Sequence, residues 1–269
     1  MAENEKMQIV RTRSSDGAMI QIECHESVTS TALLAKEYAN SSYPDRYMVF
    51  STEQTEVDVF GEKITDGHPS RGMFLSCILR PSMFPSQAGL LRALSAVAMI
   101  SALEEHTTKR LGIGWVSDIF CEKKKIGTVT LEGKLDNFTS YEYIIISFRL
   151  KMSKDVFPPR LVDMIKSVFE NESDSTELII AQNILAKFFP LYFNIKNKSK
   201  FMDVYKLKFA MRNHKAKYLS DGRKKRCKIT AVNAESGALV VQTKKGVARE
   251  ISSPANVILP KKVKAKKQQ

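Results

Sequence analysis

The chain has 269 residues, of which 43% are hydrophobic and 26% charged, which suits one large domain or a medium domain with a small appendage and excludes a disordered or collagen-like chain. Residues 194–269 hold 21 of the 42 Lys and Arg residues and four of the 29 acids, a net charge of +17, so the preceding residues carry −4. This division predicts an anionic partner for the C-terminal part, namely nucleic acid, an acidic protein surface or, with less support, a membrane face.

The N-terminal half alternates strand and helix patterns, judged from apolar periodicity and from capping residues. The predicted elements are a strand at 18–23, a helix from Thr29 or Ser30 to about Asn40, a strand at 47–51, a loop at 52–71, a strand at 72–79 and a helix from Pro85 to about His106. The polar loop is unusually long for a compact domain, and long loops of this kind often carry function.

The second half begins with strand patterns and continues with helices. The predicted elements are a meander of strands at 113–120, 125–131 and 142–150, then helices at 160–169, from Asp174 or Ser175 towards Tyr192, and at 200–213, and finally short strands at 227–232, 238–243 and 248–251. The sequence therefore predicts an α+β fold with an N-terminal extension at 1–17, a main domain at 18–213, a small all-β domain at 224–260 and a basic tail at 261–269.

Several classes of protein are excluded by what the chain lacks. The four cysteines form no C-x-x-C pair, so reduced, buried thiols are expected rather than a zinc site or a disulfide scaffold, and no metal site is predicted. The apolar run at 90–103 contains Arg92 and is expected to be too short and too polar to cross a bilayer. The first residues resemble no signal sequence, which favours an intracellular address, whether cytoplasmic or, after removal of a presequence, mitochondrial.

Four short motifs then follow one another in a recognisable order. They are Val28-Thr29-Ser30-Thr31-Ala32, Ser51-Thr52-Glu53-Gln54-Thr55, Trp115-Val116-Ser117-Asp118-Ile119 and Lys125-Ile126-Gly127, with Leu79-Arg80-Pro81 between the second and the third. Each motif is weak alone, but their order, spacing and predicted elements together resemble the biotin protein ligase family over about residues 18–259.

The resemblance implies a mixed sheet with helices, related to class II aminoacyl-tRNA synthetases, and a small SH3-like barrel at the C-terminus. It also implies a reaction in which biotin attacks Mg-ATP and a lysine of the biotin carrier domain of a carboxylase then attacks the biotinyl adenylate. Ser30, Thr31 and Gln54 match biotin-binding positions, and Trp115 is either a wall of that site or a core residue. The matches for ATP or Mg²⁺ are Asp118, alternatively a carboxylate paired with a nearby base, and Lys125.

The chain departs from the family where the chemistry is most demanding. The family's G-R-G-R-x-G-R phosphate loop is replaced by residues 56–62, which contain three acids, one glycine and no arginine. Such acids are expected to face the triphosphate and repel it. Gly114 stands where the resemblance places the catalytic lysine, although Lys109 or the turn at 123–125 could reach the site by a change of register. Residues 147–151 replace G-x-G-I-N, so no catalytic residue is assigned.

Two hypotheses follow. One is a ligase-like binding or scaffold subunit whose adenylation is impaired or lost and whose basic C-terminal region binds RNA or a ribonucleoprotein. The other is an active biotin–protein ligase that uses biotin and Mg-ATP and docks an acidic carrier domain through the same charges. Lipoate ligation is a lesser alternative. The predicted anion-binding patch consists of Lys215, Lys217, Arg223, Lys224, Lys225 and Arg226.

Overall fold

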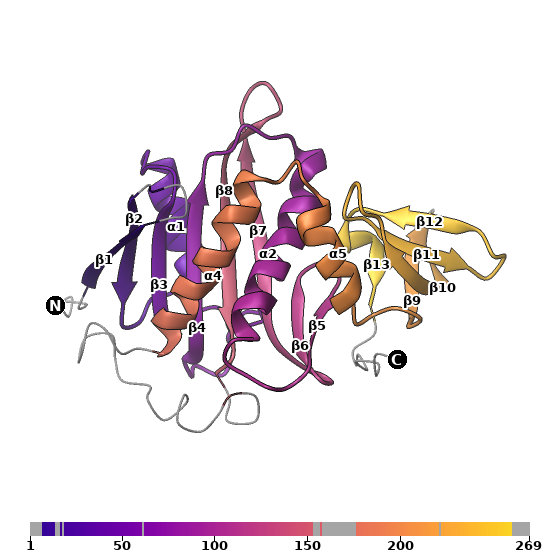
Figure 1. Ribbon diagram of the computed structural model, residues 1–269, viewed down its shortest axis with the longest axis horizontal. Helices are drawn as coiled ribbons and strands as arrows, with labels where there is room; N and C mark the ends of the chain where they lie inside the picture. The colour runs from indigo at the N-terminus through magenta and orange to yellow at the C-terminus, as the bar shows by residue number, and fades with distance from the viewer. Residues whose placement is uncertain are drawn as a thin grey trace.

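A computed structural model describes residues 7–13, 17, 19–60, 62–152, 157, 176–220 and 222–259 of the chain. The described residues form an eight-stranded sheet with helices on both faces and, at one end of it, a smaller five-stranded sheet (Figure 1). The predicted α+β class is confirmed. The predicted helix at 160–169, the cap at Asp174 or Ser175, Gly61 and the tail at 261–269 lie outside the described residues.

The large sheet has the strand order β1-β2-β3-β4-β8-β7-β6-β5. Its strands are β1 (Met7–Arg13), β2 (Met19–His25), β3 (Tyr47–Gln54), β4 (Ser70–Leu79), β5 (Leu111–Gly114), β6 (Asp118–Cys121), β7 (Lys124–Leu135) and β8 (Tyr141–Leu150). β2 and β3 run parallel and the other neighbours are antiparallel. The first strand lies within the segment predicted as an N-terminal extension and adds an edge to the sheet.

Helices cover the two faces unequally. The helix α1 (Thr31–Asn40) packs on one face, while α2 (Ala88–Leu103), α4 (Thr176–Phe193) and α5 (Ser199–Lys208) lie on the other, where the larger apolar core sits (Figure 1). Ser30 is the N-cap of α1, as predicted. Because α1 has only ten residues, it covers only part of its face. The remaining part of that face holds the polar residues described below.

The apolar helix α2 is preceded by one 3-10 turn, η1 (Pro85–Gln87). Together they span 19 residues that are long and apolar enough to cross a membrane, more than the run of fourteen judged too short from the sequence. However, 72% of this segment is buried inside the protein, in contact with α4, α5 and β7. These contacts make α2 the central helix of the core. All four cysteines are buried and unpaired, as predicted.

The small sheet has the strand order β12-β11-β10-β9-β13, antiparallel throughout. Its elements are β9 (Lys215–Ser220), β10 (Arg223–Val232), β11 (Leu239–Thr243), β12 (Ala248–Ile251), η2 (Pro254–Asn256) and β13 (Val257–Ile258). It therefore begins at β9, a strand that the sequence analysis did not anticipate, rather than at residue 224. The five strands suit the expected SH3-like module, and their closure into a barrel stays a prediction.

One predicted strand was wrong. Residues 113–120 form not one strand but two, β5 and β6, which are paired with each other and joined by a turn at 115–117. The turn is held from outside the segment, since Val129 N donates to Ser117 O at 3.0 Å and Ser117 Oγ donates to Val129 O at 2.6 Å. The apolar residues of this turn are buried by tertiary contacts. Apolar patterning alone therefore does not distinguish the turn from a continuous strand.

Candidate functional site

The start of α1 and the end of β3 are joined by the side chain of Gln54. Gln54 Oε1 accepts hydrogen bonds from Thr31 N at 2.7 Å and Thr31 Oγ1 at 3.1 Å, and Gln54 Nε2 donates to Val57 O at 2.8 Å. Ser30 Oγ accepts from Leu33 N at 3.5 Å. The structure thus brings together the three polar residues that the resemblance assigns to biotin, and that assignment stays a prediction.

A chain of buried hydroxyl groups continues from Thr31 into the sheet. Thr31 Oγ1 lies 2.9 Å from Ser76 Oγ on β4, which lies 2.8 Å from Ser147 Oγ on β8. Sequence reasoning missed Ser76 and Ser147. Each is a lone hydroxyl inside an apolar strand, and since a buried hydroxyl is costly without a partner, that pattern signals a polar patch within the core.

Arg149 is a further buried polar residue, two positions after Ser147 on the same strand face. Its side chain is 4% exposed, its Nε has no hydrogen-bond partner, and no ion pair joins it in the described part of the chain. Burial lowers the pKa of its guanidinium, against the opposing charges of Glu132 and Asp58. Sequence reasoning treated residues 147–151 only as a departure from the family pattern. The available signal of a buried polar residue was an arginine inside an otherwise apolar strand.

Asp118 and Lys125 form an ion pair near the same face. Their Oδ1 and Nζ atoms lie 2.9 Å apart, and Thr128 Oγ1 donates to the same oxygen at 2.8 Å. Lys125 Nζ also lies 5.4 Å from the centre of the Phe60 ring. The ion pair agrees with the alternative in which Asp118 is paired with a nearby base, and the assignment of Asp118 to ATP or Mg²⁺ stays a prediction. No group of three His, Cys, Asp or Glu side chains suited to a metal ion occurs among the residues described.

The loop after β3 closes on itself. Val57 and Lys63 form an isolated bridge, and Asp58 Oδ1 accepts hydrogen bonds from the backbone N–H groups of Phe60 and Glu62, both at 2.8 Å. Backbone amides of this kind can bind the oxygens of an anion. Here a carboxylate of the loop itself already occupies them.

The three acids of this loop differ in placement. Asp58 is turned into its own loop, while Glu56 and Glu62 are exposed, so the expectation that all three face a triphosphate is corrected for Asp58. Between them, Val59 is 4% exposed and packs near Gly72 of β4, where an added Cβ would lie 2.9 Å from Val59 Cγ1. The loop is therefore anchored on the sheet by an apolar contact.

Gly114 and Trp115 lie at the junction with the small sheet. A Cβ at Gly114 would lie 2.6 Å from Phe120 Cε2 and 3.1 Å from Met211 Cε, so a larger side chain does not fit without rearrangement. Trp115 is 2% exposed, and its Nε1 donates at 3.0 Å to Gly237 O, in the connection between β10 and β11 of the small sheet. This places Trp115 in the interface between the two sheets, the core alternative of the sequence analysis.

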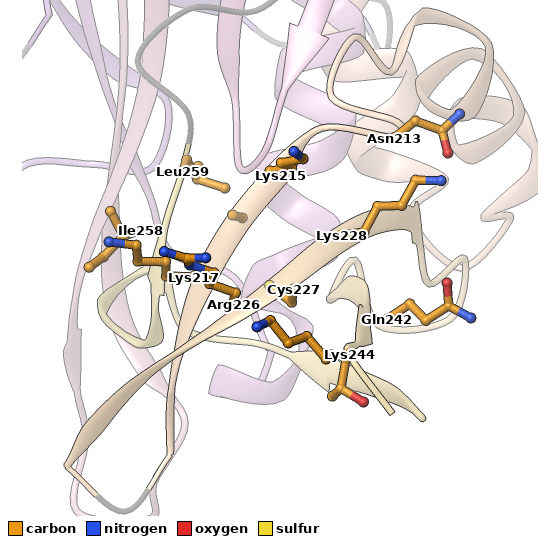
Figure 2. Close-up of a pocket in the computed structure, with 12 residues that line it drawn as sticks. Asn213, Lys215, Lys217, Arg226, Cys227, Lys228, Gln242, Lys244, Ile258 and Leu259 are labelled. Carbon is orange, nitrogen blue, oxygen red and sulfur yellow. The ribbon is translucent and has the colours of Figure 1, made fainter. Parts of the chain in front are cut away.

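The second candidate site is a basic face of the small sheet. Two cross-strand pairs, Lys215 with Lys228 and Lys217 with Arg226, place like charges opposite each other, an arrangement that is unfavourable without an anion. They line a cavity of about 900 Å³ on the exposed side of β9 and β10 (Figure 2). The described residues that line it, none of which is an acid, are Asn213, Lys215, Ala216, Lys217, Arg226, Cys227, Lys228, Gln242, Thr243, Lys244, Ile258 and Leu259.

The predicted patch is divided between this cavity and a neighbouring hollow. Lys215, Lys217 and Arg226 line the cavity, and Lys224 and Lys225 line the hollow, of about 630 Å³. Arg223 lies at the start of β10 and lines neither. Sequence reasoning missed four bases of this surface: Lys228, Lys244, Lys245 and Arg249. The available signal was the alternation of Lys228 with Cys227 and Ile229 on β10, whereas Lys244 and Lys245 lie in the turn after β11.

No protein-family model matches the chain. The bifunctional ligase/repressor BirA of Bacillus subtilis is 27% identical over 167 residues, which cover 61% of this chain and 51% of the relative, and the same protein of Bacillus spizizenii is 27% identical over 164 residues. The chain thus spans about half the length of the curated relatives it matches.

Solved structures agree in fold. Biotin protein ligase from Aquifex aeolicus, in complex with biotin and ATP, has a TM-score of 0.63 and 18% identity, over 89% of this chain and 98% of its own. A biotin protein ligase-like protein of unknown function from Silicibacter sp. TM1040 also has a TM-score of 0.63, with 10% identity over 90% of this chain and 97% of its own. Fold, partial sequence similarity and the order of the motifs agree: the chain has the fold of the biotin protein ligases and is similar in part of its sequence to BirA.

Proposed function

We propose that the chain is a biotin-ligase-like pseudoenzyme, a binding or scaffold subunit in which adenylation of biotin is impaired or lost. The observation that carries this proposal is the loop after Gln54, in which Asp58 Oδ1 accepts hydrogen bonds from the backbone N–H groups of Phe60 and Glu62. Forming an acyl adenylate requires preorganised donors for the phosphate charge that develops. A loop whose amides bind its own carboxylate does not supply them.

The packing around Gly114 supports the same proposal. The family resemblance places a catalytic lysine at this position, but the space beside its Cα is filled by Phe120 and Met211. Loss of one such transition-state contact commonly lowers kcat by about 100-fold or more. The missing charge therefore cannot be restored at Gly114 without repacking the junction.

The direct test is the production of pyrophosphate and biotinyl adenylate from biotin and Mg-ATP. The expected result is no turnover above a protein-free blank under conditions in which the Bacillus subtilis relative turns over. Turnover comparable to that of the relative would contradict the proposal.

An active ligase is the second candidate, favoured by the Lys125 cation beside Asp118. In that case biotin and Mg-ATP are its substrates, and a biotin carrier domain accepts the biotin. Turnover would then disappear in Lys125→Met and persist in Lys36→Met, a change at an exposed lysine on α1. Turnover that survives Lys125→Met would exclude this role for Lys125.

For the basic face we propose an RNA, alone or in a ribonucleoprotein, as the partner. The cross-strand cation pairs support it, because several aligned bases neutralise successive phosphates and release counterions. Fluorescence anisotropy with a labelled RNA is expected to show affinity that falls steeply with salt. The double variant K217E/R226E should lose binding, whereas the matched variant R11E/K36E, on β1 and α1, should keep it.

Other outcomes of this titration exclude RNA as the partner. Binding that is independent of salt, or equal in both double variants, would contradict the proposal. Binding of an acidic biotin carrier domain in place of RNA would assign the face to the active-ligase alternative.

A further inference from the structure

The hollow beside the basic face lies between two β-hairpins, one formed by β9 and β10 and the other by β11 and β12. β10 pairs with β11 only from Cys227 onward, so residues 223–226 pair with β9 alone and the two hairpins separate there. The hollow of about 630 Å³ opens at this point. Its lining comes from both hairpins: Tyr218, Lys224, Lys225 and Arg226 from the first, and Thr243, Lys244, Lys245, Val247 and Arg249 from the second.

The lining of the hollow is strongly positive. Six of the described residues that line it are Lys or Arg, and none of them is an acid. Elsewhere on the surface lysines pair with acids, as Lys187 does with Glu105 at 2.7 Å. No such pair joins Lys224, Lys244 or Lys245 to another residue in the described part of the chain. Cations that face one another across a gap repel, so the hollow suits an anionic ligand that lies between the hairpins.

The hollow adjoins the cavity on the basic face. Arg226, Thr243 and Lys244 line both, and the first and last of these are labelled in the view of the cavity (Figure 2). The cross-strand cation pairs of β9 and β10 line the cavity up to this shared boundary. The cavity and the hollow therefore form one basic path that ends between the two hairpins.

We infer that the RNA bound by the basic face is single-stranded and passes from the cavity into the hollow; this rests on the proposed RNA partner. A duplex is a rigid helix that proteins contact mostly by its shape and its outer phosphates, which requires an open face rather than a gap between hairpins. A single strand can lie within a positively charged groove that follows its backbone. Between the hairpins, its phosphates meet cations on both sides.

Two features of the hollow suit unpaired bases. Arg249 is exposed, with its guanidinium carbon 5.8 Å from the centre of the Tyr218 ring, and unpaired bases stack on guanidinium planes. On the side towards β11, residues 223–226 have no neighbouring strand among the described residues, so their backbone donors and acceptors are available to base edges. The bases of a duplex have these edges already paired, so the hollow favours unpaired nucleotides.

Fluorescence anisotropy with a labelled oligouridylate and a labelled RNA duplex of the same length tests the inference on the full chain. The single strand should bind about 10-fold or more tightly than the duplex at the same salt concentration. The variant K224Q/K245Q removes one charge from each hairpin, so the slope of log affinity against log salt for the single strand should fall by about 1.4. The matched variant R11Q/K36Q, on β1 and α1, should leave this slope unchanged.

Arg249→Lys separates stacking from charge, because it keeps the positive charge and removes the guanidinium plane. It should weaken binding of the single strand by about fivefold or more without changing the salt slope, and it should leave binding of the duplex unchanged. Since Arg249 is exposed, the variant should also keep the unfolding temperature of the native chain.

Equal or tighter binding of the duplex would overturn the inference and leave RNA as the partner of the basic face. An unchanged salt slope in K224Q/K245Q would also overturn it, because the strand would then not enter the hollow. Absence of binding by both forms of RNA would end the proposed RNA partner and the inference together. Polyglutamate that binds in place of RNA, and is lost in K224Q/K245Q, would assign the hollow to an acidic peptide instead.

Discussion

Glu23 is a buried acid on β2 whose carboxylate accepts several hydrogen bonds. The hydroxyls of Tyr38 and Tyr47 donate to it at 2.6 and 2.5 Å, and His25 Nε2 lies 2.7 Å from it. Burial alone would raise the pKa of Glu23, but these hydrogen bonds favour the charged form and hold its pKa below the usual 4.5. The cluster joins β2 and β3 to α1.

The lowered pKa of Glu23 makes stability depend on pH in a definite direction. Ionised Glu23 stabilises the fold above the unfolded pKa of about 4.5, and this contribution is lost as the pH falls through the lower folded pKa. Glu23→Gln should lower the free energy of unfolding by about 1–3 kcal/mol at neutral pH and by less in acid. Urea unfolding measures both values, with Tyr38→Phe as the milder control, and an equal loss at both pH values would refute the assignment.

At the scale of elements, the start of α2 touches the turn between β10 and β11. A Cβ at Gly89 would lie 2.3 Å from Ser236 O, and a Cβ at Gly237 would lie 2.7 Å from Gly89 O. With the hydrogen bond from Trp115 to Gly237, this contact fixes the small sheet on the large one. The two glycines are required by close approach of the backbones.

Helix propensity and packing make opposite predictions for Gly89. Propensity alone favours Gly89→Ala by about 1 kcal/mol, whereas overpacking against Ser236 costs about 1–3 kcal/mol. We expect the cost of overpacking to exceed the gain in helix propensity. Gly89→Ala should therefore unfold at a lower temperature, and protease should cut its small sheet first. Ser82→Ala, just before η1, is a control outside the contact. A stabilised Gly89→Ala would show that the contact is loose in solution.

The sequence predicted elements well where local signals decided them and less well where distant contacts did. The cap at Ser30 and the helix it begins follow from one side chain and one pattern, and both are confirmed. The turn at 115–117 is fixed by a distant contact, since Ser117 is bonded to Val129 in the following strand β7. The strand β9 alternates lysines with Ala216 and Tyr218, and from the sequence this segment was interpreted only as charged. Its role as a strand emerges only from its pairing with β10 and β13.

At the scale of the whole molecule, motif order predicted the fold because each motif marks an element boundary. The polar residues that the resemblance assigns to biotin were also found this way, since Ser30, Thr31 and Gln54 lie inside motifs. Arg149 was not, because its burial depends on strands β4 and β7 on either side of it. The separation of charge along the chain likewise predicted a basic domain, but not that its bases would align across strands.

The central claim is that the family's site persists here as a binding site that no longer takes nucleotide. Calorimetric titration of the full chain with Mg-ATP, with and without saturating biotin, tests this most directly. The account predicts no saturable binding of nucleotide in either titration. Tight, saturable binding of Mg-ATP that is strengthened by biotin would contradict it.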